Sequence, residues 1–119
     1  MQKNNRASGT NAESIAEEFL KTKGMKTVQK NFHFGRNGEI DLVMNDGETL
    51  VFVEVKARSS DAFGTPESAV TFKKQQTMRT TAQGYLYVKN IQNRECRFDV
   101  VAIVFKNGEP EIRHIPNAF

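Results

Sequence analysis

Residues 38–56 read GEIDLVMNDGETLVFVEVK, two apolar-rich segments on either side of a polar tetrapeptide. An Asp-Gly pair between such segments is a strong signal for a β-hairpin. We therefore predict strands at Glu39–Met44 and Thr49–Ala57, joined by a turn at Asp46 and Gly47.

The register of this hairpin decides which side chains share a face. With a two-residue turn at the Asp-Gly pair, Asp41 faces Phe52 on the neighbouring strand. Side chains alternate along a strand, so one face is predicted to be chemical and the other to belong to the core. The chemical face is predicted to hold Glu39, Asp41, Phe52, Glu54 and Lys56, and the core face to hold Ile40, Leu42, Val51, Val53 and Val55.

Three charged side chains on the chemical face have the composition of a metal-dependent hydrolytic site. In the predicted register Asp41 and Glu54 are diagonal neighbours with backbones about 7–8 Å apart, so both carboxylates can bind one ion. Two such carboxylates repel unless a cation lies between them, and Mg²⁺ commonly takes one or two carboxylates together with phosphate oxygens. Lys56 shares their face, where its amine can hold an attacking water or the charge that develops on a phosphate.

A Glu-x-Lys pair on a strand is usually only a solvent-facing ion pair. Its place in an apolar hairpin, with three charges on one face, favours a functional site, because burying charges is costly. We therefore predict phosphodiester hydrolysis with Asp41, Glu54 and Lys56 as catalytic residues and Mg²⁺ or Mn²⁺ as cofactor.

The segments around the hairpin complete an α/β pattern. Helical spacing of apolar residues predicts a first helix at 11–23, and a second helix is expected to start at Thr65-Pro66 and to end near Lys89-Asn90. Further strands are predicted at Val28–Phe34, Arg97–Phe105 and Glu111–Ile115. This order predicts one domain, residues 1–119, in which helices flank a mixed sheet and residues 1–9 are flexible.

The composition excludes several classes of protein. Seventeen Lys and Arg against fourteen Asp and Glu give a net charge of +3, which modestly favours a polyanionic partner but is more often ordinary solubilising charge. The single Cys96 excludes a disulfide framework within one chain and a thiolate cluster for zinc or iron–sulfur. The sequence has neither a signal peptide nor a run of membrane-spanning length, so we expect a cytoplasmic protein with no membrane partner.

Several segments carry a resemblance to known proteins: Ala12-Glu13, Gly38–Leu42, Val51–Lys56, Phe63-Gly64 with Pro66, Lys74, Arg97–Val100 and the tail from His114-Ile115 to Ala118-Phe119. The hairpin segments resemble the PD-(D/E)xK nuclease superfamily, in which an acidic residue on one strand precedes Glu-x-Lys on the next. Ile40 stands where the motif's name puts proline, which superfamily members often lack. From end to end the chain resembles the YraN-like family of uncharacterised bacterial proteins.

This resemblance implies a restriction-endonuclease-like fold, also described as a tRNA-endonuclease-like domain, and a site similar to that of archaeal Holliday junction resolvases. By position it implies Asp41 and Glu54 as metal ligands, Lys56 as the catalytic lysine and Glu13 as an acid from the first helix. It also implies a homodimer, because a resolvase is expected to cut two strands together.

Glu13 and Lys74 each have two interpretations. The spacing of Glu13 from Thr10 is that of a capping box, and its carboxylate is equally suited to be a third metal ligand. Lys74 precedes Met78 by one turn of the second helix, so its amine either reaches a phosphate or stays solvated. A basic rim for nucleic acid is predicted from Arg36, Arg58, Lys73, Lys74 and Arg79.

Other polar residues are interpreted as structural. Arg97 and Asp99, two residues apart on a strand, are expected to form an ion pair or structural hydrogen bonds. His33 and His114 lack the spacing of a zinc site and are expected to pack or to form hydrogen bonds, and Cys96 is expected to pack.

The leading functional hypothesis is a Mg²⁺- or Mn²⁺-dependent endonuclease acting on nucleic acid, on DNA rather than RNA, with branched or single-stranded DNA as substrate. The alternative is a non-catalytic nucleic-acid-binding module that keeps the nuclease fold. Both bind in a salt-sensitive manner, so cleavage is what separates them. A scaffold for a protein partner would show neither metal dependence nor salt-sensitive binding to nucleic acid.

Overall fold

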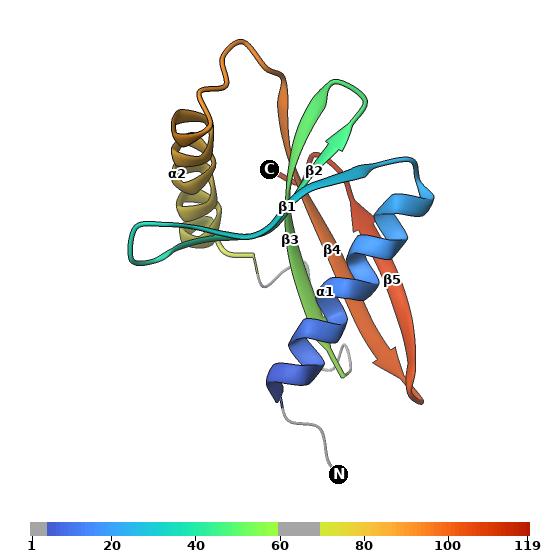
Figure 1. Cartoon of the computed structure of the whole chain (residues 1–119). Coiled ribbons are helices and arrows are strands. Elements are labelled where there is room, and N and C mark those ends of the chain that lie inside the picture. Colours follow the sequence, from blue (N-terminus) through green and yellow to red (C-terminus); the bar gives the residue numbers. More distant parts are fainter. Residues whose placement is uncertain (1–4, 60–69) are drawn as a thin grey trace.

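A computed structural model describes residues 5–59 and 70–119 of the chain (Figure 1). It contains two helices and five strands in the expected order of helix, three strands, helix, two strands. The elements are α1 (Asn5–Thr22), β1 (Lys26–Phe34), β2 (Gly38–Asp46), β3 (Thr49–Arg58), α2 (Phe72–Val88), β4 (Cys96–Lys106) and β5 (Glu109–Ile115).

The five strands form one mixed sheet in the order β1-β2-β3-β4-β5. β3 and β4 are parallel, because α2 lies between them in the sequence and carries the chain back across the sheet, and the other neighbours are antiparallel. The two helices cover opposite faces of the sheet (Figure 1). The predicted α/β class, a mixed sheet flanked by helices, is confirmed, and the architecture is compatible with a restriction-endonuclease-like core.

α1 packs on the sheet through the predicted apolar stripe. Ala12, Ala16 and Leu20 are buried in one core cluster with side chains of β2, β3 and β4. The helix starts at Asn5, so the predicted start at residue 11 is wrong and residues 5–9, expected to be flexible, are helical. Thr10 and Glu13 therefore lie inside α1, and their spacing is not that of a cap at its N-terminus.

α2 covers the opposite face of the sheet. Its first residue is Phe72, and the hydroxyl of Thr71 caps it by accepting a hydrogen bond of 3.1 Å from the backbone N–H of Lys74. The start predicted at Thr65-Pro66 is wrong for this helix, and those two residues lie outside the described ones. The buried apolar side chains of α2 are Met78, Ala82 and Tyr85, which share one face of the helix.

The hairpin of β2 and β3 exists, but its register differs from the predicted one by two residues. Asp46 pairs with Thr49, so the turn consists of Gly47 and Glu48 rather than Asp46 and Gly47. Gly47 has a positive φ of 62°, the left-handed conformation that a tight hairpin turn requires and that glycine adopts without strain. A shift of two keeps each side chain of β3 on its predicted face relative to β2.

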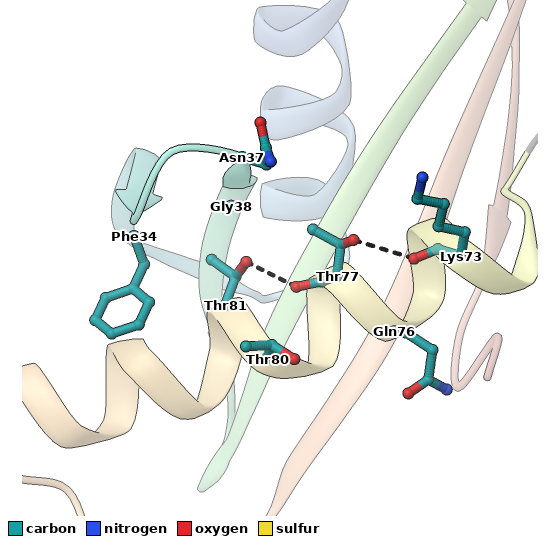
Figure 2. A pocket seen from close by; sticks show the side chains of 8 residues that line it. All are labelled: Phe34, Asn37, Gly38, Lys73, Gln76, Thr77, Thr80 and Thr81. Carbon is teal, nitrogen blue, oxygen red and sulfur yellow. Dashed lines mark hydrogen bonds between the residues drawn. The ribbon is translucent and has the colours of Figure 1, made fainter.

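The hairpin of β1 and β2 reaches across to α2 and packs closely against it. At Gly38 any Cβ atom would collide with Thr81 of the helix, and at Gly84 it would lie 2.5 Å from ring atoms of Phe34. These two glycines therefore permit strand and helix backbones to approach one another. As a result, the turn at residues 35–37 lies beside the first half of α2 (Figure 2).

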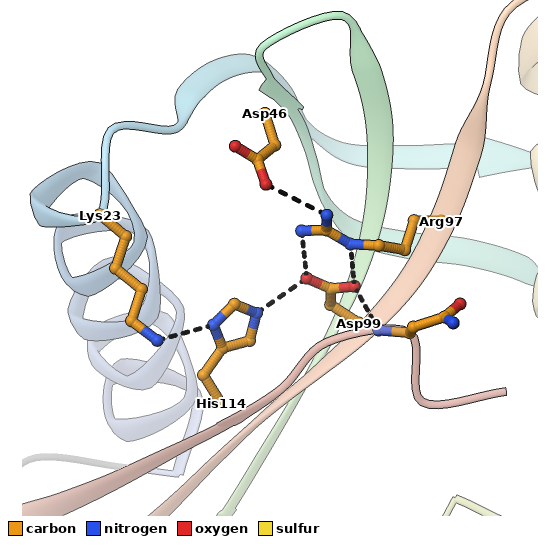
Figure 3. A network of polar contacts seen from close by, with 6 residues as sticks. Lys23, Asp46, Arg97, Asp99 and His114 are labelled. Carbon is orange, nitrogen blue, oxygen red and sulfur yellow. Dashed lines mark hydrogen bonds and ion pairs between the residues drawn. The ribbon is translucent and has the colours of Figure 1, made fainter.

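A buried polar network fastens the C-terminal segment to the sheet (Figure 3). Asp99 is fully buried and accepts hydrogen bonds from Arg97 at 2.9 and 3.0 Å, from the backbone N–H of Asn117 at 3.0 Å, and from Nε2 of His114 at 2.7 Å. Nδ1 of His114 lies 3.0 Å from the amine of Lys23 at the end of α1. The expected ion pair of Arg97 with Asp99 and the expected hydrogen bonding of His114 are both confirmed.

Within the described residues, neither helix has the length and apolar character needed to cross a membrane.

Candidate functional site

β2 separates from β3 at Asp41, and this separation forms the candidate site. The two strands pair from Asp46 opposite Thr49 as far as Leu42 opposite Val53. Beyond Leu42, β2 continues only with β1, where Ile40 pairs with Phe32. One further step of the observed register would set Asp41 directly opposite Glu54. We call this place the fork. It is defined by Asp41, Glu54, Lys56 and Lys74.

The alternation of side chains along β2 also breaks at the fork. Ile40 packs with Phe32, Phe52 and Tyr85 on the α2 face of the sheet, whereas Leu42 packs on the α1 face. The prediction that Ile40 shares a face with Leu42 is therefore wrong. A strand that has left its neighbour is no longer held to the strict pleat, so its side chains can turn.

Glu54 is the most buried acid of the fork, with a side chain only 6% exposed. Its Oε2 lies 3.5 Å from Nζ of Lys56, two residues further along β3, and 3.6 Å from Nζ of Lys74 on α2. Both lysine side chains remain about a third exposed, at 30% and 32%. The fork therefore presents two amines, each of which contacts a buried carboxylate and is partly open to the solvent. Lys74 lies at the fork, so its amine is in a position from which it could reach a phosphate bound there.

Asp41 is held by the backbone of the neighbouring strand. Its Oδ2 accepts a hydrogen bond of 2.9 Å from the backbone N–H of Val55. Burial, followed by the negative charges of Glu54 and Glu39, raises the pKa of Asp41 to about 7, although the Val55 hydrogen bond and Lys74 act in the opposite direction. Two carboxylates that resist joint ionisation are a favourable place for a cation, because a positive charge between them removes the repulsion.

The raised pKa of Asp41 predicts how the stability of the metal-free protein, kept in EDTA, depends on pH. The folded-state pKa of about 7 exceeds the usual 3.8, so this group's contribution to stability is complete below pH 3.8 and is lost as the pH rises through 7. Asp41→Asn removes the charge while its amide oxygen can still accept from Val55. We expect its melting temperature to exceed that of the wild type by about 5 °C at pH 8 and by much less at pH 5.

Asp41→Ala is the matched comparison for this measurement. Alanine also removes the charge but leaves the N–H of Val55 without its acceptor, which costs about 1–3 kcal/mol. The melting temperature of Asp41→Ala should therefore rise less above that of the wild type at pH 8 than the melting temperature of Asp41→Asn does. Parallel pH profiles for the wild type and Asp41→Asn would contradict the assignment of a destabilising charge at Asp41.

Glu13 approaches the fork from α1. Burial, then the charges of Asp41 and Glu39, raise its pKa, while a hydrogen bond from the Asn31 side chain acts in the opposite direction. Within the described residues, however, no three His, Cys, Asp or Glu side chains are grouped closely enough to hold a metal ion. The charge of Asp41 thus acts on Glu13, but Glu13 does not complete a three-ligand group with the fork acids among these residues. Asp41 and Glu54 remain, and a pair of carboxylates is the usual protein share of a Mg²⁺ site that also takes phosphate oxygens and water.

The predicted basic rim is only partly assembled at the fork. Lys74 is there, Arg58 ends β3 four residues beyond Glu54, and Lys73 and Arg36 are exposed on α2 and on the turn between β1 and β2. Arg79 belongs elsewhere. Its guanidinium lies over the rings of Phe98 and Phe119, 5.2 and 5.4 Å from their centroids, where it helps to hold the C-terminal tail.

Two residues near the fork were missed as site residues. Glu39 raises the pKa of both Asp41 and Glu13, and its position two residues before Asp41 is the signal that could have revealed it. Asn31 is the residue whose side chain bonds to Glu13, and it has a positive φ of 54°. A lone asparagine inside an expected strand carries no sequence signal for such a role, because its backbone conformation depends on the bend of β1.

Comparison with known proteins places the chain in a family. Residues 12–103, which include both fork acids, match the model of the uncharacterised protein family UPF0102. The chain is 42% identical over 119 residues to a UPF0102 protein of Geobacter metallireducens, covering 100% of this chain and 97% of that protein. It is 44% identical over 117 residues to a UPF0102 protein of Syntrophomonas wolfei, covering 97% and 99% of the two chains. A UPF0102 protein of Rhodococcus opacus is 41% identical over 116 residues, with 97% and 98% covered. The chain therefore belongs to the uncharacterised protein family UPF0102, the YraN-like family that its sequence resembles.

Proposed function

We propose that this protein is a divalent-metal-dependent nuclease that hydrolyses phosphodiester bonds in nucleic acid at the fork. The observation that carries the proposal is the meeting of two carboxylates from diverging strands, one buried beside two lysines and one with a pKa raised to about 7. Such an arrangement is costly to fold and is therefore expected where it is used. DNA, branched or single-stranded, is the proposed substrate, and a homodimer is the proposed assembly.

The donor set of the fork fits Mg²⁺ or Mn²⁺. Asp41 and Glu54 offer carboxylate oxygens, which these hard cations prefer, and the charge of Glu13 adds to the attraction from α1. When bound, the cation would polarise the phosphate and lower the pKa of a coordinated water.

The lysines of the fork are assigned to the phosphate and the attacking water. Lys56 and Lys74 come from different elements, β3 and α2, so their amines approach one point from two directions. Each is partly exposed and can leave Glu54 for a phosphate oxygen, which brings a positive charge to the place where negative charge develops. Lys73, Arg58 and Arg36 are proposed as further phosphate contacts, which position nucleic acid without reading its sequence.

A cleavage assay tests this proposal. The purified protein is incubated with single-stranded, duplex and four-way-junction substrates in Mn²⁺, in Mg²⁺ and in EDTA. We expect cleavage of at least one substrate with metal and none in EDTA. Intact substrates under every metal condition, with a protein that is folded and binds nucleic acid, would refute the proposal.

Lys56→Met separates the role of the amine from that of the carboxylates. Methionine keeps the apolar stem and removes the charge, so we expect cleavage to fall by about 10²–10³-fold while Mn²⁺ binding, followed by calorimetry, is retained. Lys26→Met, an exposed lysine at the start of β1, is the control and should cleave at the wild-type rate. Loss of Mn²⁺ binding in Lys56→Met would contradict the assignment of its amine to water and phosphate.

A second candidate is a non-catalytic nucleic-acid-binding module that keeps the fold. It is favoured by the two lysines that already neutralise Glu54. Such a module would bind nucleic acid equally well in EDTA and Mn²⁺ and leave it intact. The cleavage assay therefore distinguishes the two candidates directly.

A further inference from the structure

A pocket of about 310 Å³ lies between α2 and the hairpin of β1 and β2 (Figure 2). It shares the first turn of α2 with the fork, because Lys73 lines the pocket and the next residue, Lys74, contacts Glu54. The strands contribute Phe34, and the turn that follows it contributes Asn37. The helix contributes Gln76, Thr77, Thr80 and Thr81.

The lining of this pocket offers unused hydrogen-bonding groups. The hydroxyls of Thr77 and Thr81 each donate to the backbone carbonyl four residues earlier, at 3.1 and 2.7 Å, so their oxygens still have lone pairs to accept. The side chains of Asn37, Gln76 and Thr80 form no hydrogen bond with any residue that the structure describes. An amide side chain carries both donors and acceptors, so the lining can match a ligand that carries both.

Phe34 adds a fixed aromatic surface to the pocket. Its ring lies close to the backbone of α2 at Gly84, and it stacks with Phe32 at a centroid distance of 6.5 Å and an interplanar angle of 15°. Phe34 is nevertheless 39% exposed, so part of the residue remains open to the solvent. A held and partly exposed aromatic ring beside polar groups is a surface on which a planar ring can stack.

The chemistry of the lining selects one class of ligand. Among the described residues, the lining combines an aromatic ring, neutral donors and acceptors and one cation, Lys73, with no acidic side chain. The volume is at the lower end of the range for ligand pockets, about 300–1,000 Å³, so it admits one small ring system and no duplex. These features match an unpaired nucleobase attached to a phosphate.

We propose that the pocket holds one unpaired nucleobase, stacked on Phe34 and hydrogen-bonded by Gln76 and Asn37, with Lys73 at its phosphate. This inference rests on the proposed nuclease function and names its substrate class, which is nucleic acid with a single-stranded segment next to the cleaved bond. The chain reads the presence of a free base there rather than a duplex sequence.

Binding to chains with and without bases tests the proposal. Fluorescence anisotropy compares an oligothymidylate with an abasic deoxyribose-phosphate chain of the same length, in EDTA so that nothing is cleaved, and a ribonucleotide chain tests the other sugar. The two deoxy chains carry the same phosphates, so their difference isolates the contribution of the bases. The wild type should bind the chain with bases about tenfold more tightly, and equal affinity for chains with and without bases, for both sugars, would overturn the proposal.

Phe34→Leu should lose most of this base preference while keeping its affinity for the abasic chain. Tyr87→Leu is the matched control, because Tyr87 is an aromatic residue of α2 that is 84% exposed and does not line the pocket. It should keep the wild-type preference. If Phe34→Leu fails to fold, the double variant Gln76→Ala with Thr80→Val, two exposed positions, must lower the preference at least about threefold. If the folded pocket variant, Phe34→Leu or the double variant, keeps the wild-type preference for the chain with bases, the proposal is overturned.

The two proposals fail in different ways. A base preference that depends on Phe34, together with no cleavage under any metal condition, would support the nucleobase pocket and refute the nuclease function. If the protein cleaves nucleic acid in a metal-dependent manner but binds abasic and normal chains equally, the nucleobase pocket is refuted and the nuclease function is supported.

Discussion

Glu54→Gln is expected to lower the rate of nucleic-acid cleavage by at least about 100-fold. The substitution keeps the size of the side chain but removes the charge that lies beside Lys56 and Lys74 and that raises the pKa of Asp41. Without that charge the fork offers the cation one carboxylate in place of two, so metal binding should also weaken. The measurement is a single-turnover rate on the best substrate of the cleavage assay, over a titration of Mn²⁺.

The fold of Glu54→Gln should survive, because the two lysines are each about a third exposed and can be solvated when their partner is neutral. Glu48→Gln, the same substitution at the exposed turn of the same hairpin, is the control and should cleave normally. A wild-type rate for a folded Glu54→Gln would remove Glu54 from the site, and with it the proposed mechanism.

Asp99→Ala is expected to destabilise the protein by about 3–5 kcal/mol, the usual cost of leaving buried charged partners without their counterpart. The variant removes the acceptor for Arg97, for His114 and for the backbone of Asn117. Urea denaturation followed by circular dichroism measures the change. Glu111→Ala, which breaks an exposed ion pair with Lys106, is the control and should cost less than about 1 kcal/mol.

The pH dependence of this network has a definite sign. Burial opposes the ionisation of Asp99, but hydrogen bonds from His114, Arg97 and Asn117 outweigh it and hold the pKa below the usual 3.8. A lowered pKa contributes stability that is present above pH 3.8 and is lost as the pH falls through the lower folded-state value. The difference between wild type and Asp99→Ala should therefore be constant at neutral pH and shrink only in strong acid. A loss of less than 1 kcal/mol at pH 7 would show that the network contributes little.

The hairpin shows why an error in strand register can leave two predicted neighbours side by side. The Asp-Gly pair predicts a turn at Asp46 and Gly47, but the turn is Gly47-Glu48, because the observed pairing starts at Asp46 opposite Thr49. That error shifts the register by two residues, and two is the period of side chains in a strand. Asp41 and Glu54 therefore remain neighbours, each one residue beyond the last pair of the two strands, where the observed register would set them opposite rather than diagonal. A shift of one would have separated them.

Other features depend on contacts between residues far apart in the sequence. The break of alternation at Ile40 follows from the parting of β2 and β3, which no local pattern encodes. The link from Lys23 through His114 to Asp99 joins three separate elements. For α1, the capping-box spacing of Thr10 was misleading, because residues 5–9 contain no proline to prevent the helix from extending towards the N-terminus.

The parting of β2 and β3 means that the two acids are supported by different halves of the sheet. Asp41 lies on the part of β2 that pairs with β1, whose Thr27 and Lys30 hold Glu17 of α1 at 2.6 and 3.1 Å, whereas Glu54 lies on β3 beside its parallel partner β4. A hydrogen bond from the backbone N–H of Val55 to Asp41 ties the halves together at this point. We therefore expect the packing of α1 against β1 to influence the distance between the acids, so substitutions along α1 that touch neither acid are a route to tuning which cation the proposed site accepts.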